Sequence, residues 1–402
     1  MCEPRRRPRL ELAEVVRRFG AAYMDRGGVP GHHMRTLGAI RDCRTSKLGG
    51  HMLCCTTCGS TKISYNSCRN RHCPKCGGLA KELWIEDRKR ELLPVRYQHL
   101  VFTIPHQIND LCRYNARFCY RLLFRTAWST LDAFGRDPKW LGARIGATMV
   151  LHTWGQNLSL HPHVHCIVPS GGLGGQEWVE PKRGKAFLFP VKAMSKVFRG
   201  RFLTALRKAW LTKELVVPPG MPTKEKAIKE WCRKRWRQDW VVYAKPPFKG
   251  PDTVVEYLGR YTHKTAISNH RLVAMDEQNV TFQYKDYRQN GKRKLMTLNG
   301  LEFLRRFCQH ILPSGFVRIR HYGILANVHK EKALMAARRS LDMPDPPPKE
   351  ERKVRVKRLI EKLIDRGLDD CADCGAVDSL VRILIPPDAR APPKMKFNQA
   401  GV

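Results

Sequence analysis

Apolar residues recur along the chain either at helical spacing or in short β-branched and aromatic runs, so the pattern predicts both helices and strands. Helical spacing occurs in residues 9–45, in KELWIEDRKRELL before Pro94, and from Asn109 to Phe134. The runs that predict strands are HLVFTIPH, ATMVLHTW, HVHCIV, WVVYAK and NVTFQYKDY. The two kinds of element alternate irregularly, without an internal repeat.

The composition indicates a folded, strongly basic protein. The 402 residues are 42% hydrophobic, enough for two or three domains with a core. Lys and Arg number 74 against 36 acidic residues, and the formal charge of +38 is spread along the whole chain. This charge favours a polyanion as the partner, because basic side chains neutralise phosphates and release their counterions. A chain merely kept soluble by its charge, or a basic membrane-surface protein, is a weaker interpretation.

Two features bear on the compartment. The sequence has no run of eighteen apolar residues, and its first thirty residues lack the apolar block of a signal peptide. We therefore expect a soluble cytoplasmic protein without membrane association. Its fifteen cysteines are an odd number, which argues against a disulfide scaffold and for reduced thiols and metal sites.

Two basic segments differ from the rest of the chain. Residues 192–237 interleave Trp210, Trp231 and Trp236 with basic residues, which predicts a helical insertion that contacts DNA. From about Lys330 the chain becomes basic and Pro-rich, which predicts a linker followed by an exposed tail.

A cysteine-rich segment has the spacing of a zinc ribbon. Cys55-x2-Cys58 and Cys73-x2-Cys76 are separated by fourteen residues, so four thiolates could converge tetrahedrally on one structural zinc ion. A glycine after each pair permits the tight turn that brings the sulfurs inward. We expect these four ligands, with Cys68 as the substitute.

A further CxxC pair lies near the carboxyl terminus. Cys371-x2-Cys374 has no partner pair nearby in the sequence. Alone, this spacing is a weak signal, so a zinc site, a free-thiol turn and a site shared across chains all remain open.

The run HPHVHCIV places three histidines at every second position. On a strand, His161, His163 and His165 would face one side and the intervening apolar residues the other. Imidazole nitrogens two residues apart on a strand can converge on one divalent ion. Taken alone, however, such histidines are more often structural.

A pair of tyrosines lies on a helix predicted for residues 251–263. Tyr257 and Tyr261 are four residues apart, which places them on one helix face and lets both hydroxyls reach one site. The alternative is an aromatic stripe that packs on the sheet, but nearby Arg260, Lys264 and Arg271 make purely apolar burial less favourable.

The order of these motifs resembles a known family. A CxxC…SCRNRHCPKC module is followed by HLVFTIPH, WGQNLSLHPHVHCIVPSGG, WVVYAKPPF, YLGRYTHK and GFVRIRHYGILAN. From about Leu37 to Asn327 the chain is similar to the two-tyrosine HUH transposases of rolling-circle insertion sequences, the insertion-sequence ninety-one type. The resemblance implies an α+β fold of the HUH endonuclease type, an antiparallel sheet flanked by helices, preceded by a small helical and zinc-ribbon domain.

The resemblance also implies roles for individual residues. His163 and His165 form the histidine–hydrophobic–histidine motif that would hold catalytic Mg²⁺ or Mn²⁺, and Tyr257 and Tyr261 would be the nucleophiles. The third metal ligand stays open, and its candidates are Gln156, His161, Glu256 and His263. The implied domains are residues 1–48, helical; 49–92, zinc-binding; 93–330, catalytic, with the insertion at 192–237; and 331–402, the tail.

The implied activity is that of a prokaryotic, DNA-associated transposase. It would nick and transfer single-stranded DNA at element ends through a covalent 5′-phosphotyrosine, with structural Zn²⁺. The sequence does not indicate an oligomeric state. One alternative is a plasmid replication initiator or relaxase with the same chemistry. Another is a non-enzymatic zinc-ribbon DNA-binding protein. A three-carboxylate transposase is disfavoured, because no spaced set of acids lies near the other motifs.

Overall fold

The computed structural model describes residues 8–182, 188–245, 248, 253–254, 257, 259 and 262–387. The chain divides into two compact units. We call residues 85–264 and 312–347 the central unit and residues 1–84, 265–311 and 348–402 the outer unit, names that refer only to their order along the chain. Residues 265–311, which we expected within the catalytic domain, thus belong to the outer unit. Among the helices that the structure describes, none is both long and apolar enough to cross a membrane.

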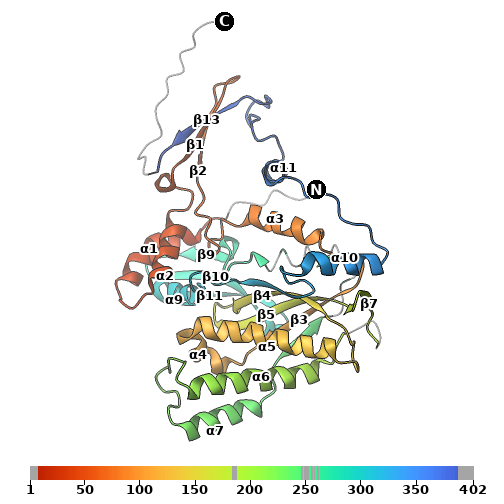
Figure 1. Ribbon diagram of the computed structural model, residues 1–402. Helices are drawn as coiled ribbons and strands as arrows, with labels where there is room; N and C mark the ends of the chain where they lie inside the picture. Colours follow the sequence, from red (N-terminus) through yellow and green to blue (C-terminus); the bar gives the residue numbers. More distant parts are fainter. Residues whose placement is uncertain are drawn as a thin grey trace. The chain divides into compact units, whose positions relative to one another are not determined.

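The central unit is built on a five-stranded antiparallel sheet of strand order β12-β4-β5-β3-β8 (Figure 1). Its strands are β3 Tyr97–Thr103, β4 Gly146–Trp154, β5 Leu160–Pro169, β8 Val242–Lys245 and β12 Ile319–Gly323. Helices flank the sheet, so the expected α+β fold with an antiparallel sheet is confirmed.

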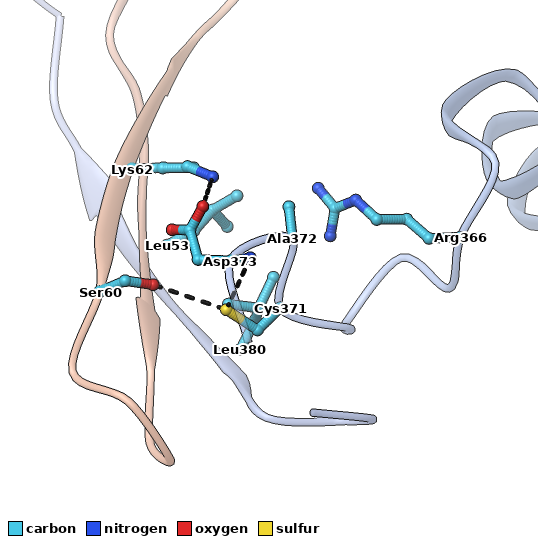
Figure 2. Close-up of a pocket in the computed structure, with 8 residues that line it drawn as sticks. All are labelled: Leu53, Ser60, Lys62, Arg366, Cys371, Ala372, Asp373 and Leu380. Atoms are coloured by element: carbon cyan, nitrogen blue, oxygen red, sulfur yellow. Dashed lines mark hydrogen bonds and ion pairs between the residues drawn. The ribbon is translucent and has the colours of Figure 1, made fainter. Parts of the chain in front are cut away.

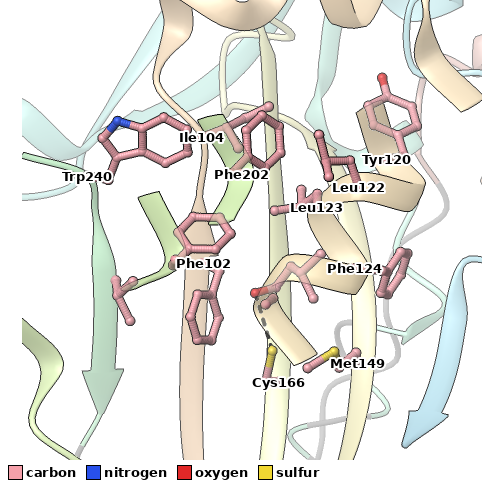
Figure 3. Close-up of a cluster of buried hydrophobic side chains, with 14 of the residues drawn as sticks. Phe102, Ile104, Tyr120, Leu122, Leu123, Phe124, Met149, Cys166, Phe202 and Trp240 are labelled. Atoms are coloured by element: carbon pink, nitrogen blue, oxygen red, sulfur yellow. Dashed lines mark hydrogen bonds between the residues drawn. The ribbon is translucent and has the colours of Figure 1, made fainter. Parts of the chain in front are cut away.

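The two faces of this sheet differ in character, because side chains alternate along each strand and directly opposed residues share a face. One face is apolar and buried. It includes Leu100, Phe102, Met149, Leu151, Val164 and Cys166. Helices α5 (Ala116–Arg136) and α6 (Val191–Leu211) cover this face, and Figure 3 shows their side chains meeting those of the strands. The other face carries the histidines.

The stretch expected to be a basic insertion is instead part of the core. Every fourth residue of α6 is apolar and fully buried, and these residues are Met194, Phe198, Phe202 and Leu206. The ring of Phe198 lies 5.1 Å from that of Phe102 on β3, centroid to centroid. The following helix α7 (Glu225–Trp236) adds buried Ile228 and Cys232. Because basic residues lie between these apolar positions, the composition of the segment does not reveal its buried apolar face.

A second, smaller core closes the central unit. It contains Leu93, Leu173, Ile324, Leu325, Leu334 and Ala337. The contributing and neighbouring elements are β6 Gly172–Gly174, β7 Glu177–Val179 and α10 Lys330–Ser340, whereas α4 Asn109–Tyr114 contributes to the larger core. Helix α10 lies in the segment expected to begin the exposed tail, yet its apolar face is buried here.

In the outer unit, α1 packs against α2 and α9, and α9 packs against a three-stranded antiparallel sheet of order β11-β10-β9. Their bounds are α1 Leu12–Met24, α2 Gly31–Arg41, α9 Gly300–Cys308, β9 Leu272–Met275, β10 Asn279–Asp286 and β11 Lys292–Asn299. Gly300 begins α9 directly against Phe19, where an added Cβ would lie 2.4 Å from the ring. The amino-terminal helices and residues 265–311 thus share one core.

A second sheet of the outer unit joins the cysteine-rich segment to the carboxyl-terminal region. It has the order β13-β1-β2, with β1 Gly50–Cys55, β2 Thr61–Tyr65 and β13 Leu380–Ile385 (Figure 1). Strand β13 pairs antiparallel with the whole of β1. Part of the segment expected to be an exposed tail is therefore a paired strand, in which three of the six residues are exposed. The remaining helices are α3 Gly78–Lys89, α11 Arg352–Ile364, η1 Ser46–Leu48, η2 His106–Ile108, η3 Asn269–Arg271 and η4 Tyr287–Gln289.

Candidate active site

Three histidines meet on the polar face of the central sheet. His163 and His165 lie on β5, and His152 lies on β4 directly opposite His163. One ring nitrogen from each of the three lies within 4.8 Å of the others. A short turn joins the two strands, with the Gly155 amide donating to the Ser159 carbonyl at 2.9 Å. The arrangement can hold one divalent ion with three imidazoles.

Hydrogen bonds determine which nitrogens face the ion. His163 Nδ1 lies 2.7 Å from the His161 carbonyl oxygen, so this nitrogen carries the proton and donates it. His165 Nδ1 lies 2.9 Å from His99 Nε2 on β3. The remaining nitrogen of both rings is Nε2. Such bonds at the far side of the ring fix its orientation for metal binding.

Burial keeps these histidines neutral. It lowers the pKa of His163 from 6.5 to about 4, and it holds the pKa of His165 well below 6.5. The pKa of His99 falls to about 3 through burial and the nearby positive charge of Lys245. Neutral imidazole is the form that binds metal, so the rings are ready to act as ligands at neutral pH.

Among the described candidates, the third histidine of the group is His152, which sequence reasoning missed. His161 lies on the same strand face but is exposed and outside the group. His263 is also outside the group, and Glu256 lies outside the described residues. Gln156 is half-buried in the turn between β4 and β5. The signal for His152 was present in ATMVLHTW, but it depends on the register between two strands.

Tyr257 lies beside this histidine group. Its hydroxyl oxygen is 3.2 Å from His99 Nδ1 and 3.0 Å from Lys245 Nζ. Lys245 is the last residue of β8 and lies directly opposite His99. The strand register therefore places the Lys245 and His99 side chains together beside Tyr257. The Tyr257 ring packs edge-on against the His99 ring, with centroids 5.1 Å apart. Tyr261, the other expected nucleophile, lies outside the described residues.

Among the described residues, eight cysteines form two groups of four. The first contains Cys43, Cys68, Cys73 and Cys76. Cys76 Sγ lies 3.5 Å from Cys43 Sγ and 3.7 Å from Cys68 Sγ. Four sulfurs placed tetrahedrally about 2.3 Å from a zinc ion are about 3.8 Å apart, so this group fits the metal. Hydrogen bonds from the Cys68 and Cys73 side chains hold the pKa of the Cys43 thiol well below its usual value.

The expected grouping of Cys55 and Cys58 with Cys73 and Cys76 is therefore wrong. Cys55 and Cys58 lie instead with Cys371 and Cys374. The β1–β2 hairpin explains the division, because Cys55 and Cys58 lie at its turn whereas the first group lies near its open end. Five strand residues span roughly 17 Å, too far for one ion. Sequence reasoning included Cys68 as a substitute ligand but missed Cys43, which has no CxxC spacing.

Two family models match the chain. The model described as "Transposase zinc-binding domain" matches residues 15–104, and the model described as "Putative transposase" matches residues 146–332. The first range contains the whole Cys43, Cys68, Cys73 and Cys76 group, and the second contains the three histidines. Together the models define a transposase with an amino-terminal zinc-binding domain.

Two relatives are similar over most of their lengths. "Putative transposase y4qJ" of Sinorhizobium fredii (strain NBRC 101917 / NGR234) is 44% identical over 370 residues, which cover 90% of this chain and 92% of the relative. "Transposase for insertion sequence element IS801" of Pseudomonas savastanoi pv. phaseolicola is 32% identical over 371 residues, covering 89% and 85%. No solved structure matches the chain. The chain belongs to the IS91 family of insertion-sequence transposases, enzymes that cut and recombine DNA.

Proposed function

We propose that this transposase nicks single-stranded DNA at the ends of its element and transfers the strand through a covalent 5′-phosphotyrosine, as rolling-circle transposition requires. The observation that carries the proposal is the hydroxyl of Tyr257, which is joined through His99 to the three-histidine group. A nucleophile and a metal site side by side on one sheet face are the parts that cleavage of a DNA phosphate needs.

The metal would be Mg²⁺ or Mn²⁺, held by His152, His163 and His165. When bound, it supplies a positive charge that polarises and orients the scissile phosphate. Three neutral imidazoles leave that charge undiminished. They also favour a metal that accepts nitrogen ligands, so we expect Mn²⁺ to support activity at lower concentration than Mg²⁺.

His99 and Lys245 would favour the reactive form of Tyr257. With His165 using Nε2 as its ligand atom, its Nδ1–H donates to His99 Nε2. His99 then carries its proton on Nδ1 and donates to the tyrosine oxygen, as Lys245 does. Two donors, one of them charged, stabilise the phenolate more than the phenol.

The bond changes balance without another reactant. The Tyr257 oxygen attacks phosphorus, an oxygen–phosphorus bond forms, and the bond from phosphorus to the 3′-oxygen breaks. The hydroxyl loses one proton and the departing 3′-oxygen gains one. The phosphodiester energy is conserved in the phosphotyrosine, so rejoining needs no nucleotide cofactor. Tyr261, four residues further on, would accept a second strand while Tyr257 remains loaded.

Single-stranded DNA fits the polar face. The formal charge of +38 supplies sequence-independent affinity for phosphates. Tyr243 on β8 is 51% exposed and lies directly opposite Val101, on the face that carries His165. An exposed aromatic ring beside Lys245 can stack with an unpaired base, as proteins that bind single strands commonly do.

The proposal is tested with a single-stranded oligonucleotide that carries an element end, incubated with the full-length protein and Mn²⁺. We expect an adduct that survives denaturing electrophoresis and is lost with chelator, with H163A/H165A and with Y257F/Y261F. His161→Ala is the matched control, because His161 lies on the same strand but outside the group. Adduct formation in all three impaired reactions would refute the nuclease mechanism.

The competing functions predict other results. A replication initiator or relaxase would form the same adduct with a plasmid origin, whereas the family of this chain favours element ends. A non-enzymatic zinc-ribbon DNA-binding protein would retain its whole activity in Y257F/Y261F.

A further inference from the structure

A second group of four cysteines joins segments that are far apart in the sequence. Cys55 and Cys58 come from the β1–β2 turn, and Cys371 and Cys374 precede β13. Cys55 Sγ lies 3.8 Å from Cys374 Sγ, and Cys58 Sγ lies 3.8 Å from Cys371 Sγ. These distances match the spacing of about 3.8 Å that a tetrahedral zinc–thiolate site imposes, whereas a disulfide would need about 2.05 Å.

The two contributing turns have the same local geometry. In the first turn, the Gly59 amide donates to the Cys55 carbonyl at 3.0 Å, and the Cys55 amide donates to the Ser60 carbonyl at 2.9 Å. In the second turn, Gly375 and Cys371 repeat both bonds, at 3.0 Å to the Cys371 carbonyl and 2.9 Å to the Ala376 carbonyl. The sequence CTTCG thus folds like CADCG.

Glycine and amide groups suit both turns to metal binding. Gly59 and Gly375 have φ values of +71° and +76°, which glycine adopts without strain. An amide in each turn donates to the first sulfur, Cys58 N to Cys55 Sγ and Asp373 N to Cys371 Sγ, each at 3.4 Å. Such donors stabilise thiolate, the form of cysteine that binds zinc.

The turns also support each other crosswise. Ser60, which follows the first turn, lies 3.5 Å through its Oγ from Cys371 Sγ (Figure 2). Ser379, which follows the second turn, accepts a hydrogen bond from the Cys55 thiol at its Oγ, at 3.5 Å. Figure 2 also shows the ion pair between Lys62 and Asp373 that crosses from one segment to the other. Polar contacts therefore surround the sulfurs from both sides.

The sheet around this group has little apolar core of its own. Its buried cluster consists of Met52, Cys54 and Ile385, with Ile383 packed against it. Four of the five residues of β2 are exposed. A sheet this small cannot hold a segment from the other end of the chain by apolar burial alone, and metal binding commonly replaces a core in such modules.

We propose that Cys55, Cys58, Cys371 and Cys374 bind a second structural zinc ion, which fastens the carboxyl-terminal segment to the β1–β2 hairpin within one chain. Four thiolates fill all the tetrahedral positions, so this site is structural and has no open position for a substrate. Two of its ligands lie beyond residues 15–104, the range of the matching zinc-binding domain. The site is thus additional to that of Cys43, Cys68, Cys73 and Cys76.

Metal analysis of the purified full-length protein tests the proposal. We expect two zinc ions per chain in the wild type and one in C371S/C374S. Cys54→Ala is the matched control, because Cys54 lies on the same hairpin but in neither group, and it should retain two zinc ions. One zinc ion in the wild type, or two in C371S/C374S, would overturn the proposal.

A second measurement on the wild type does not depend on how the variant folds. The irregular, largely exposed segment 343–351 is a natural place for a limited proteolytic nick. After nicking, the fragment that contains β13 should stay bound, and removal of zinc by a chelator should release it. Retention after complete zinc removal would contradict the inference. A site shared across chains would instead convert oligomers to monomers on zinc removal, which also contradicts it.

Discussion

The hydroxyl oxygen of Tyr257 lies 3.2 Å from His99 Nδ1, and the same histidine contacts His165 through its other ring nitrogen at 2.9 Å. One ring therefore connects the hydroxyl of the proposed nucleophile to the three-histidine group. This connection requires His99 to be neutral, and burial lowers its pKa to about 3. At neutral pH the ring can thus accept at one nitrogen and donate at the other.

His99→Phe should slow nicking roughly 10- to 100-fold, since a hydrogen bond to a charged group contributes about 1.5–3 kcal/mol. Loss of a donor to the phenolate should also move the rising limb of the pH–rate profile to higher pH. The measurement is the single-turnover nicking rate between pH 6 and 10. Lys245→Met should shift the profile in the same direction, and Lys245→Arg should restore it. An unchanged profile in His99→Phe would show that the ring only fills space.

His152→Ala should raise the Mn²⁺ concentration needed for half-maximal nicking at least about 10-fold, because it removes one of three ligands. His161→Ala is the matched control and should have no comparable effect, since that ring is exposed and outside the group. The measurement is a Mn²⁺ titration of the nicking rate. If the two variants had the same effect, His152 would not be the third ligand.

Acid should destabilise the metal-free protein through its buried histidines. The folded-state pKa is about 4 for His163, about 3 for His99 and about 4 for His321, all lowered chiefly by burial from 6.5. Below pH 6.5 the unfolded chain binds protons that the folded chain does not, so the free energy of unfolding decreases as the pH is lowered. The loss approaches 1.4 kcal/mol per histidine per pH unit, roughly, until the folded pKa is reached.

Urea unfolding of chelated protein at pH 7 and pH 5.5 measures this effect. The urea concentration at the midpoint should be lower at pH 5.5 than at pH 7. It should stay nearly constant between pH 7 and pH 8, where these histidines are neutral in the folded and the unfolded state. A midpoint that did not fall towards pH 5.5 would show that these histidines are not buried as described.

Phe198→Ala should lower the free energy of unfolding by about 3–5 kcal/mol, because it empties a fully buried site between α6 and β3. Trp236→Ala on α7 is the comparison, since its side chain is 49% exposed and should matter much less. Equal effects in chemical denaturation would support the peripheral insertion that the basic composition suggested.

The sequence was most informative where the residues that form a feature all lie in one helix or strand. The alternation of histidines in β5 predicts a face of the strand, and the structure places His163 and His165 on it together. The presence of both helices and strands also follows from the apolar patterns, whereas the α+β class was implied by the family resemblance. In both cases the periodicity reflects burial on one side of one element, which is local in the sequence.

The sequence was least informative where two elements decide the outcome. His152 joins the group only through the register of β4 against β5. Cys55 lies near Cys371 and Cys374 only because β13 pairs with β1, from which it is far apart in the sequence. CxxC spacing predicts a knuckle, but it does not determine which two knuckles share an ion. The basic residues of α6 likewise concealed a buried stripe whose partner is the sheet.

In the proposed mechanism, a tyrosine of the 257–261 pair carries the DNA. The most direct measurement is mass spectrometry of the proteolysed adduct formed with the oligonucleotide and Mn²⁺. We predict a nucleotide joined through its 5′-phosphate to Tyr257 or Tyr261, with Tyr257 modified in Tyr261→Phe. A nucleotide on any other residue, or cleavage of the oligonucleotide with no covalent adduct, would contradict the tyrosine mechanism.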